Sequence, residues 1–357
     1  MSTPTSTGPV RIGLVGYGFG GRTFHATLIR AKPSLELVGV VTTSPERVAR
    51  LAADHPGVPA LDSLGALVDL GIEAVVVSST TGTHTELTDA ALDLGLHVVC
   101  DKPLAVDARH AAASVARAEA AGLLLTAYQN RRWDSDFLTV RRVIDSGAVG
   151  AVHRYESHFE RWAPGPDRAA WRSMSTPEDG GGLRLDLATH LVDQAVTLFG
   201  PVERVYAEIA NRRPGTVADD DLTLDLVHAD GVLSRLQASK VSGDASRRFH
   251  VSGSGGAFVL GGFDGQEPAL LAGRTPATEG EGWGVEPESV WGRIVRGDES
   301  ELVPSERGRW DLFYPAFAAA VRGQGPLPVD PHEAVTVLEI LDAAVVSARE
   351  HRVVTLD

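Results

Sequence analysis

The chain has 357 residues, more than one hydrophobic core usually organises, so we expect two domains. Its 33 basic and 47 acidic residues give a formal charge of -14, which argues against nucleic acid or an anionic membrane surface as a partner. The single cysteine, Cys100, excludes an intrachain disulfide and a zinc site built from several thiolates, so no metal is expected and a reducing compartment, the cytoplasm, is favoured. No apolar run reaches the roughly 18 residues that a bilayer crossing needs, and residues 1–9 are expected to form a disordered tail.

The first part of the chain alternates short apolar runs with helical patterns. Strands are predicted at 10–15, 35–42, 74–78, 97–100 and 123–125. Their apolar character is continuous, which is typical of parallel strands buried on both faces. An alanine-rich helix is predicted to begin at Asp107 and to end near Gly122. Residues 1–127 are therefore predicted to form an α/β domain with a doubly wound parallel sheet of the Rossmann type.

After residue 127 the predicted strands alternate in polarity. A helix is predicted at 135–146, followed by strands at 152–159, 202–210, 222–228, 232–239 and 249–252. Residues 229–231, Ala-Asp-Gly, are predicted to form a tight hairpin turn. A final amphipathic helix is predicted at 331–350. Residues 128–357 are therefore predicted to form an α+β domain with an open, mostly antiparallel sheet, and the last helix can pack back on the first domain.

Three glycines directly follow the first predicted strand and give the pattern Gly-x-Gly-x-x-Gly. In this pattern the first glycine permits a tight turn, the second lets a pyrophosphate approach the backbone, and the third lets helix and strand pack closely. An ordinary glycine turn is the alternative in a chain with 38 glycines, but the position between a strand and a helix favours a dinucleotide site. The residues predicted to contact the cofactor here are Gly16, Tyr17, Gly18, Phe19, Gly20 and Gly21.

The end of the second predicted strand indicates which dinucleotide is bound. NAD-binding domains place an acidic residue there, about 20 residues past the glycines, to bind the ribose 2′-hydroxyl. Residues 41–47 read Val-Thr-Thr-Ser-Pro-Glu-Arg, with no carboxylate at the strand tip. NADP is therefore predicted over NAD, with Thr42, Thr43, Ser44 and Arg47 as contacts to the 2′-phosphate. The alternative is that Ser44 only caps a helix and Arg47 is a solvated surface residue.

Two groups of polar residues are candidates for catalysis. Lys102 follows a predicted strand, at the sheet edge where ligands bind, and its ammonium can stabilise negative charge that develops on a substrate oxygen. Asp186 and His190 are four residues apart and share a face if they lie on a helix, so the imidazole can take a proton while the carboxylate orients it. On spacing alone, a solvated helix face explains this pair better.

Aromatic rings pack on sugar faces and polar side chains bind hydroxyls, so residues of both kinds near these groups are candidates for substrate binding. Each of them alone also has an ordinary structural explanation. The candidates are Asn130, Arg131, Trp133, His158 and Trp171.

These motifs resemble the glucose-fructose oxidoreductase / inositol dehydrogenase (Gfo/Idh/MocA) family. The resemblance covers nearly the whole chain and is carried by residues 16–21, the loop 80–84, Asp101-Lys102-Pro103 and residues 186–190. The family usually has Glu-Lys-Pro where this chain has Asp101, and it often has a proline in the loop 80–84. The longer strings at 128–139 and 264–267 are similar to the NADP-dependent scyllo-inositol dehydrogenase branch.

The resemblance implies a function that composition and spacing do not give. It implies that Lys102, Asp186 and His190 are the catalytic residues, that the second domain binds the substrate, and that its open sheet forms a homodimer or homotetramer. The implied reaction is hydride transfer between a secondary hydroxyl of a cyclic polyol or sugar and NADP, with NAD as the second choice. A reductase of another carbonyl, such as an aldose or diketone, and a non-catalytic dinucleotide-sensing regulator are the alternatives. Further cofactor contacts are then expected at Ser79, Thr80, Thr81, His84, Asp101 and Lys102.

Overall fold

The first sheet has six parallel strands in the order β3-β2-β1-β4-β5-β6, the order of a Rossmann fold. The computed structural model describes residues 8–165 and 171–356, so residues 1–7 of the predicted tail lie outside it. The predicted fold class is confirmed. The strands of this sheet are β1 (Val10–Val15), β2 (Leu35–Val41), β3 (Ala60–Leu61), β4 (Ala74–Val77), β5 (His97–Cys100) and β6 (Leu125–Ala127).

Strand β6 begins two residues later than the predicted strand at 123–125. The cause is the end of the preceding helix, α5 (Ala108–Ala121), where Gly122 adopts the left-handed conformation (φ 66°). The Leu123 N–H still donates to the carbonyl of Ala118, so Leu123 belongs to the helix cap and not to the sheet. At the other end of α5, the Asp107 side chain accepts from the His110 N–H, as expected of a helix N-cap.

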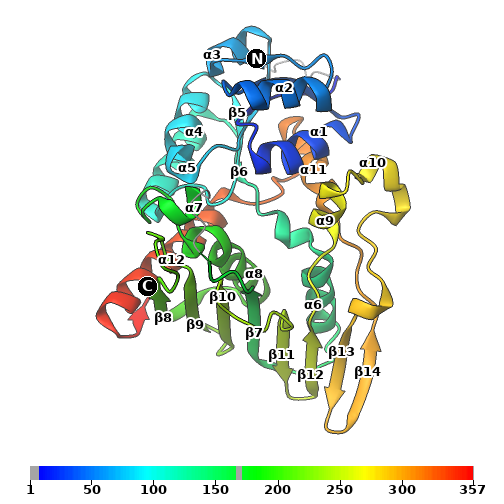
Figure 1. Ribbon diagram of the computed structural model, residues 1–357. Helices are drawn as coiled ribbons and strands as arrows, with labels where there is room; N and C mark the ends of the chain where they lie inside the picture. The colour runs from blue at the N-terminus through cyan, green and yellow to red at the C-terminus, as the bar shows by residue number, and fades with distance from the viewer. Residues whose placement is uncertain (1–7, 166–170, 357) are drawn as a thin grey trace.

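Twelve α-helices and several shorter helical turns lie around the two sheets in the part of the chain that the structure describes (Figure 1). The α-helices are α1 (Thr27–Arg30), α2 (Pro45–Asp54), α3 (Leu64–Asp69), α4 (His84–Asp93), α5, α6 (Ser135–Asp145), α7 (Trp171–Met174), α8 (Thr189–Phe199), α9 (Gln266–Leu271), α10 (Pro276–Glu279), α11 (Phe313–Val321) and α12 (Pro331–Glu350). The shorter turns are η1 (Gly21–Ala26), η2 (Thr81–Thr83), η3 (Asn130–Trp133), η4 (Arg184–Ala188), η5 (Gly280–Gly282), η6 (Glu288–Val290) and η7 (Trp310–Leu312). Among these residues, no helix combines the length and apolar character that a membrane crossing requires.

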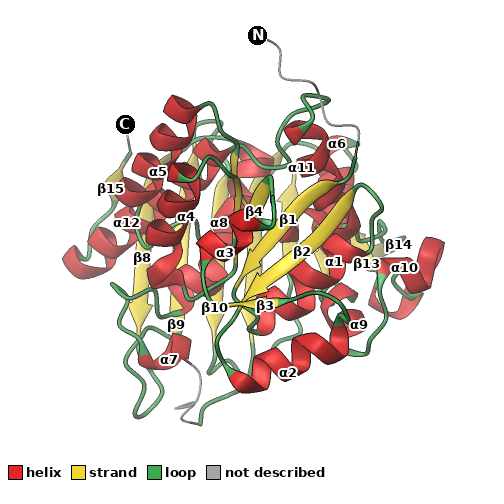
Figure 2. Ribbon diagram, turned by 90° about the horizontal axis from the view of Figure 1, so that it is seen from above, coloured by secondary structure: helices red, strands yellow, loops and turns green. Residues whose placement is uncertain are grey.

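Segments from the second half of the chain cover both faces of the first sheet. Val76 and Val99 face a core that includes Phe313 and Phe317 of α11. Neighbouring strand residues such as Val75 face the opposite core, which α4, α5 and α12 complete. Figure 2 shows β1 and β2 with α4 and α5 on one side and α1 and α9 on the other. Helices α11 and α12, which follow most strands of the second sheet in the sequence, therefore pack against the first sheet.

The second sheet has nine strands in the order β14-β13-β12-β11-β7-β10-β9-β8-β15. Only β7 and β10 pair in parallel, and the predicted hairpin at 229–231 does join the antiparallel strands β9 and β10. The short strands after residue 255 were not predicted, because they contain few alternating apolar residues. The strands are β7 (Val152–Glu160), β8 (Val202–Ala210), β9 (Asp221–His228), β10 (Leu233–Ser239), β11 (Phe249–Gly253), β12 (Gly256–Leu260), β13 (Gly292–Arg296), β14 (Glu299–Val303) and β15 (Val354–Thr355).

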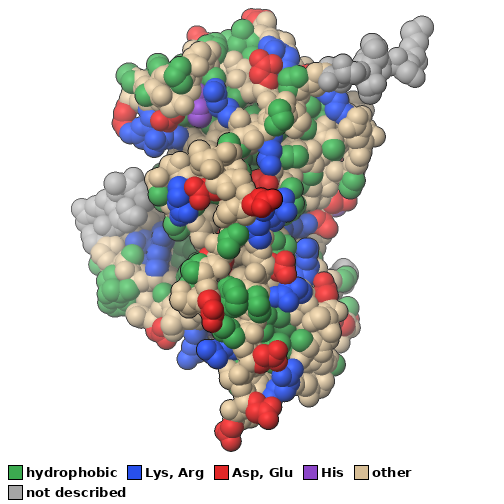
Figure 3. Space-filling model, turned by 90° about the vertical axis from the view of Figure 1, so that its right-hand side faces the viewer, with side chains coloured by type: hydrophobic (Ala, Val, Ile, Leu, Met, Phe, Trp, Pro, Cys, Tyr) green, Lys and Arg blue, Asp and Glu red, His purple; other side chains and the backbone are tan. Residues whose placement is uncertain are grey.

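One face of this sheet is apolar and the other is polar. In β9, Leu222, Leu224 and Leu226 are buried and alternate with partly exposed polar residues. The apolar face packs against α8 and α12. On the side of the molecule shown in Figure 3, acidic and basic side chains are interspersed.

Candidate active site

The three glycines after β1 have three different environments. Gly16 has φ +98°, which favours glycine, and a Cβ there would lie 2.3 Å from the carbonyl oxygen of Ser78. A Cβ on Gly21 would lie 2.1 Å from the carbonyl oxygen of Gly16. A Cβ on Gly18 would meet no described atom within 4 Å. The turn, the close packing and the open backbone that the motif predicts are thus all present, and the open backbone at Gly18 fits a pyrophosphate.

The side chains of this loop have separate positions. Tyr17 is buried, and its hydroxyl donates to Asp54 Oδ2 at 3.0 Å. Arg22 Nε donates to the same oxygen at 2.6 Å, and this hydrogen bond lowers the pKa of Asp54. Tyr17 therefore fastens the loop to the end of α2, a role that sequence reasoning did not anticipate. Phe19 is exposed and packs edge-on against Phe24.

The tip of β2 has the features of a phosphate site. Ser44 occupies the N-cap position of α2, but its hydroxyl makes no capping hydrogen bond. A helix cap thus explains the backbone position of Ser44 and leaves its hydroxyl available. Arg47 lies exposed in the first turn of the same helix, and Glu46 beside it is paired with Arg50 at 2.8 Å. Thr42 is buried and Thr43 is exposed.

The loop after β4 is held together by hydroxyl groups and by a buried histidine. Ser79 Oγ and Thr83 Oγ1 lie 2.7 Å apart, Thr80 is exposed and Thr81 is buried. His84 is buried, and its ring nitrogens lie 2.7 Å from the Pro103 carbonyl oxygen and 3.4 Å from that of Ser79. Burial lowers the pKa of His84. His84 therefore lies between the loops after β4 and β5, and its contact with the cofactor stays a prediction.

The carboxylate of Asp101 lies beneath the glycine loop. It accepts from Ser78 Oγ at 3.2 Å and from the Lys102 N–H at 2.8 Å, and His25 Nε2 lies 3.4 Å away. Burial favours the neutral form of Asp101, but the neighbouring His25, His84 and Lys102 outweigh burial and lower its pKa. His25 in turn contacts the hydroxyl of Tyr314 at 2.5 Å. Sequence reasoning missed His25, because it lies inside a helical pattern and carries no motif.

Lys102 and Asp186 meet between the two sheets. Lys102 Nζ donates to Asp186 Oδ1 at 3.1 Å and to the Asp186 backbone oxygen. Arg172 Nε lies 3.2 Å from the same Oδ1. Burial favours the neutral form of Asp186, but Lys102 and Arg172 outweigh burial and lower its pKa to about 2. Burial also lowers the pKa of Lys102, against the attraction of Asp186. Asp186 therefore bridges two cations, whereas the sequence predicted that it orients His190.

His190 lies in the first turn of α8 and is 4% exposed. Its Nδ1 is 3.2 Å from Gln129 Oε1. Burial lowers the pKa of His190 well below its usual value, and the charges of Lys102, Arg131 and Arg248 add to this effect. Burial and these charges therefore favour the neutral imidazole, the form whose free nitrogen can accept a proton. Gln129 was not among the predicted site residues, since only its contact with His190 distinguishes it.

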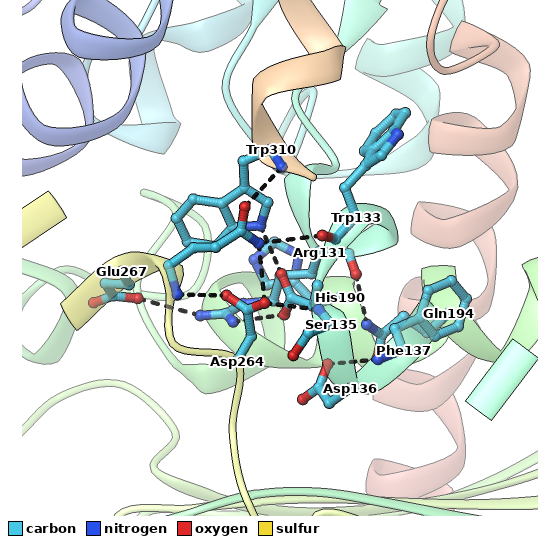
Figure 4. Close-up of polar contacts among 12 residues, drawn as sticks. Arg131, Trp133, Ser135, Asp136, Phe137, His190, Gln194, Asp264, Glu267 and Trp310 are labelled. Carbon is cyan, nitrogen blue, oxygen red and sulfur yellow. Dashed lines mark hydrogen bonds and ion pairs between the residues drawn. The ribbon is translucent and has the colours of Figure 1, made fainter. Parts of the chain in front are cut away.

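Arg131 lies in the same region of the site as His190 (Figure 4). Its guanidinium donates to Asp134 Oδ2 at 3.0 Å and lies 3.5 Å from Glu267 Oε2. It also lies over the ring of Phe159, 4.9 Å from the ring centre. Asn130 is buried in the same turn, η3. Of the predicted substrate residues, Arg131 therefore lies near His190, and its charge contributes to the lowered pKa of that histidine.

The other predicted substrate residues, Trp133, Trp171 and His158, have their described contacts with residues other than His190. Trp133 packs against Phe313, and Trp171 packs against the guanidinium of Arg172. His158 lies in β7, directly before Phe159. The ring of Phe159 faces His190, with the two ring centres 6.5 Å apart. Successive strand residues point to opposite faces, so His158 points away from His190. It lines a cavity together with Glu156 and so lies apart from His190, and its role as a substrate contact stays a prediction.

Comparisons with known proteins agree with this geometry. Residues 10–129 match the oxidoreductase family with an NAD-binding Rossmann fold, and residues 137–259 match the Gfo/Idh/MocA C-terminal domain. The chain is 36% identical to the uncharacterised oxidoreductase YdgJ of Escherichia coli, over 96% of this chain and 97% of that protein. It is 31% identical to the NADP(+)-dependent scyllo-inositol 2-dehydrogenase IolW of Bacillus subtilis, over 98% of this chain and 96% of that protein.

Solved structures give the same result for the fold. The structure of the oxidoreductase YvaA from Bacillus subtilis superposes with a TM-score of 0.90 at 29% identity and covers 99% of both chains. The resemblance inferred from the motifs is thus confirmed. This chain belongs to the Gfo/Idh/MocA family of oxidoreductases, whose N-terminal domain is a nucleotide-binding Rossmann fold.

Proposed function

We propose that the protein is an NADP-preferring oxidoreductase that acts on a secondary hydroxyl of an inositol-like polyol or sugar. The observation that carries the proposal is the contact between Lys102, from the loop after β5, and Asp186, with the buried His190 four residues further along the same helical segment. The relative IolW, described as an NADP(+)-dependent scyllo-inositol 2-dehydrogenase, supports the choice of substrate and cofactor.

The residues present fit a bound dinucleotide. The open backbone at Gly18 suits the pyrophosphate, and the free hydroxyl of Ser44 with the exposed Arg47 suits a 2′-phosphate. Thr80 and the loop after β5 would hold the nicotinamide end. When bound, the nicotinamide supplies the carbon that accepts or donates the hydride.

The side chains of the chain supply the proton chemistry. In the oxidation direction, neutral His190 accepts the proton of the substrate hydroxyl. The substrate carbon that bears this hydroxyl gives up a hydride to the nicotinamide and becomes a carbonyl carbon. Lys102 donates a hydrogen bond to the same oxygen and stabilises its negative charge. Asp186 holds the ammonium group of Lys102 in place through the 3.1 Å contact. In reduction, His190 returns the proton to the oxygen.

A substrate screen combined with one substitution tests the proposal. Inositol isomers, aldoses and other sugars are offered to the purified protein with NADP, and NADPH formation is followed by absorbance. Lys102→Met should lower kcat by about 100-fold or more, because the developing charge loses its donor. NADPH binding, measured by fluorescence titration, should persist.

Lys32→Met is the matched control, since Lys32 pairs with Asp311 in a different part of the molecule. It should retain nearly full turnover. The proposal fails if NADPH binds but no cyclic polyol or sugar is oxidised, or if Lys102→Met turns over at the wild-type rate.

A further inference from the structure

We infer that Gln129 is a positioning residue that keeps the ring proton of His190 on Nδ1 and so makes Nε2 the nitrogen that exchanges a proton with the substrate. The inference rests on the proposed function, because it names the working atom of the base assigned there. Gln129 lies in the string at 128–139 that carries part of the resemblance, but it was not among the predicted site residues and does not belong to the catalytic trio.

The contact between the two side chains sets the position of the proton. His190 Nδ1 lies 3.2 Å from Gln129 Oε1, and the two residues are 4% and 1% exposed. An amide oxygen can only accept a hydrogen bond, so Nδ1 must carry the proton for this contact to be favourable. A neutral imidazole has one ring proton, which leaves the lone pair on Nε2.

The backbone around Gln129 is fixed by the sheet that also positions Lys102. The Tyr128 N–H donates to the Cys100 carbonyl at 2.8 Å, and the Gln129 N–H donates to the Ala127 carbonyl at 2.9 Å. Strand β5 ends at Cys100, two residues before Lys102. The edge formed by β5 and β6 therefore positions both the ammonium group and the amide that holds the base.

A neutral partner suits the charges around the ring. Burial disfavours the imidazolium form of His190, and three cations add to this effect: Lys102 from the loop after β5, Arg131 from η3 and Arg248 from the residue before β11. The nearby carboxylate of Asp186 is paired with Lys102 and Arg172. Serine proteases orient their histidine with a carboxylate, which also stabilises the imidazolium. An amide orients the ring without adding a negative charge, so the base stays neutral.

The position of the proton can be measured directly. The full chain is labelled with ¹⁵N-histidine, and the signal of His190 is identified by its loss in His190→Gln. We expect the wild-type protein to show the Nδ1–H tautomer with or without NADP. A proton on Nε2 would overturn the inference.

Two substitutions test the consequence for acid–base behaviour. Gln129→Glu places a carboxylate against Nδ1, which should raise the pKa of His190 by about one to three pH units. The acidic limb of the kcat/KM profile should move to higher pH by the same amount. Gln129→Leu removes the acceptor and should lower kcat by about 10-fold or more, with KM for NADP little changed.

The control is Gln324→Glu, which makes the same change of charge at an exposed loop position after α11. It should leave both the His190 titration and the pH profile as in the wild type. An unchanged His190 titration in Gln129→Glu would contradict the inference. If no polyol is oxidised but the proton is found on Nδ1, the proposed function fails while the tautomer assignment is supported, so the two failures are distinguishable.

Discussion

At the scale of single residues, the charged groups of the site are held by partners of opposite sign. Lys102 and Arg172 share the carboxylate of Asp186, and Arg131 is paired with the buried Asp134. Removing one member of a buried pair leaves an uncompensated charge, which costs about 3–5 kcal/mol. These ion pairs therefore fix where each charge points before any ligand binds. Arg47 differs, because it lies exposed, and its role in binding a ligand phosphate is part of the proposed function.

Arg47→Ala should change which cofactor the protein uses. Loss of a charge-assisted contact to the 2′-phosphate should weaken NADPH binding by about 10-fold to 100-fold, equivalent to about 1.5–3 kcal/mol. NADH lacks this phosphate, so its binding should stay within about two-fold. Fluorescence titration of both nucleotides checks the ratio, with the exposed Arg30→Ala as a control for the change of charge. Equal losses for NADPH and NADH would contradict the assignment of Arg47.

At the scale of elements, both helices that enter the site begin with a π-helical segment. Segment η1 precedes α1 behind the glycine loop, and η4, which contains Asp186, leads directly into α8, which contains His190. A π-helical turn takes an extra residue and changes which side chains share a face, and such turns are frequent at functional sites. This explains why two residues spaced four apart contact different partners: Asp186 contacts Lys102 and His190 contacts Gln129.

Gly21→Ala should disrupt the junction of β1 and η1. The new Cβ would lie 2.1 Å from the Gly16 carbonyl oxygen, so the helix must move away from the strand. We expect the free energy of unfolding to fall by about 1–3 kcal/mol. NADPH affinity should fall as well, because the backbone that faces the pyrophosphate moves. Thermal unfolding and nucleotide titration measure the two effects.

Gly65→Ala provides the comparison for this glycine. Gly65 lies exposed in α3, where a Cβ would meet no described atom within 4 Å. Alanine is the better helix former, so stability should stay the same or rise by up to about 1 kcal/mol. Similar behaviour of the two variants would show that close packing at Gly21 is unimportant.

At the scale of the whole molecule, the fold buries histidines as neutral groups. Burial lowers the pKa of His84, His190 and His228 below the usual value of 6.5. Their neutral forms favour the folded state above pH 6.5, and this contribution is lost as the pH falls through the folded pKa values. Each histidine that takes up a proton on unfolding adds a slope of up to about 1.4 kcal/mol per pH unit.

The melting temperature should therefore fall steadily from pH 7 to pH 5, and His84→Gln should make this fall shallower. Scanning fluorimetry across this range gives the slope for each variant, whatever the absolute stability of His84→Gln. His332 is the opposite case, because its hydrogen bond to Glu119 raises its pKa and its contribution is lost as pH rises. His332→Gln should not make the acid-side fall shallower. An identical slope in wild type and His84→Gln would contradict the prediction.

The local parts of the fold could be predicted from the sequence, because they depend on neighbouring residues. Continuous apolar runs predicted the five longer strands of the first sheet, and the glycine spacing predicted the loop that opens at Gly18. The family resemblance, rather than spacing, implied the catalytic group of Lys102, Asp186 and His190, whose roles stay a proposal. The largest shift of a strand boundary, two residues at β6, occurred where the helix cap at Gly122 competed for the same residues, and the other boundaries differed by at most one residue.

Only the tertiary structure decided which side chains serve as partners. Gln129 and His190 are 61 residues apart, and His25 and Tyr314 are 289 residues apart. No local pattern encodes such contacts, since they depend on how two sheets and their covering helices pack together. For the same reason, residue type alone suggested His158 as a substrate contact, whereas the register of β7 turns it to the opposite face of the sheet. The residue types determined which chemistry is available, and long-range packing decided which atoms can carry it out.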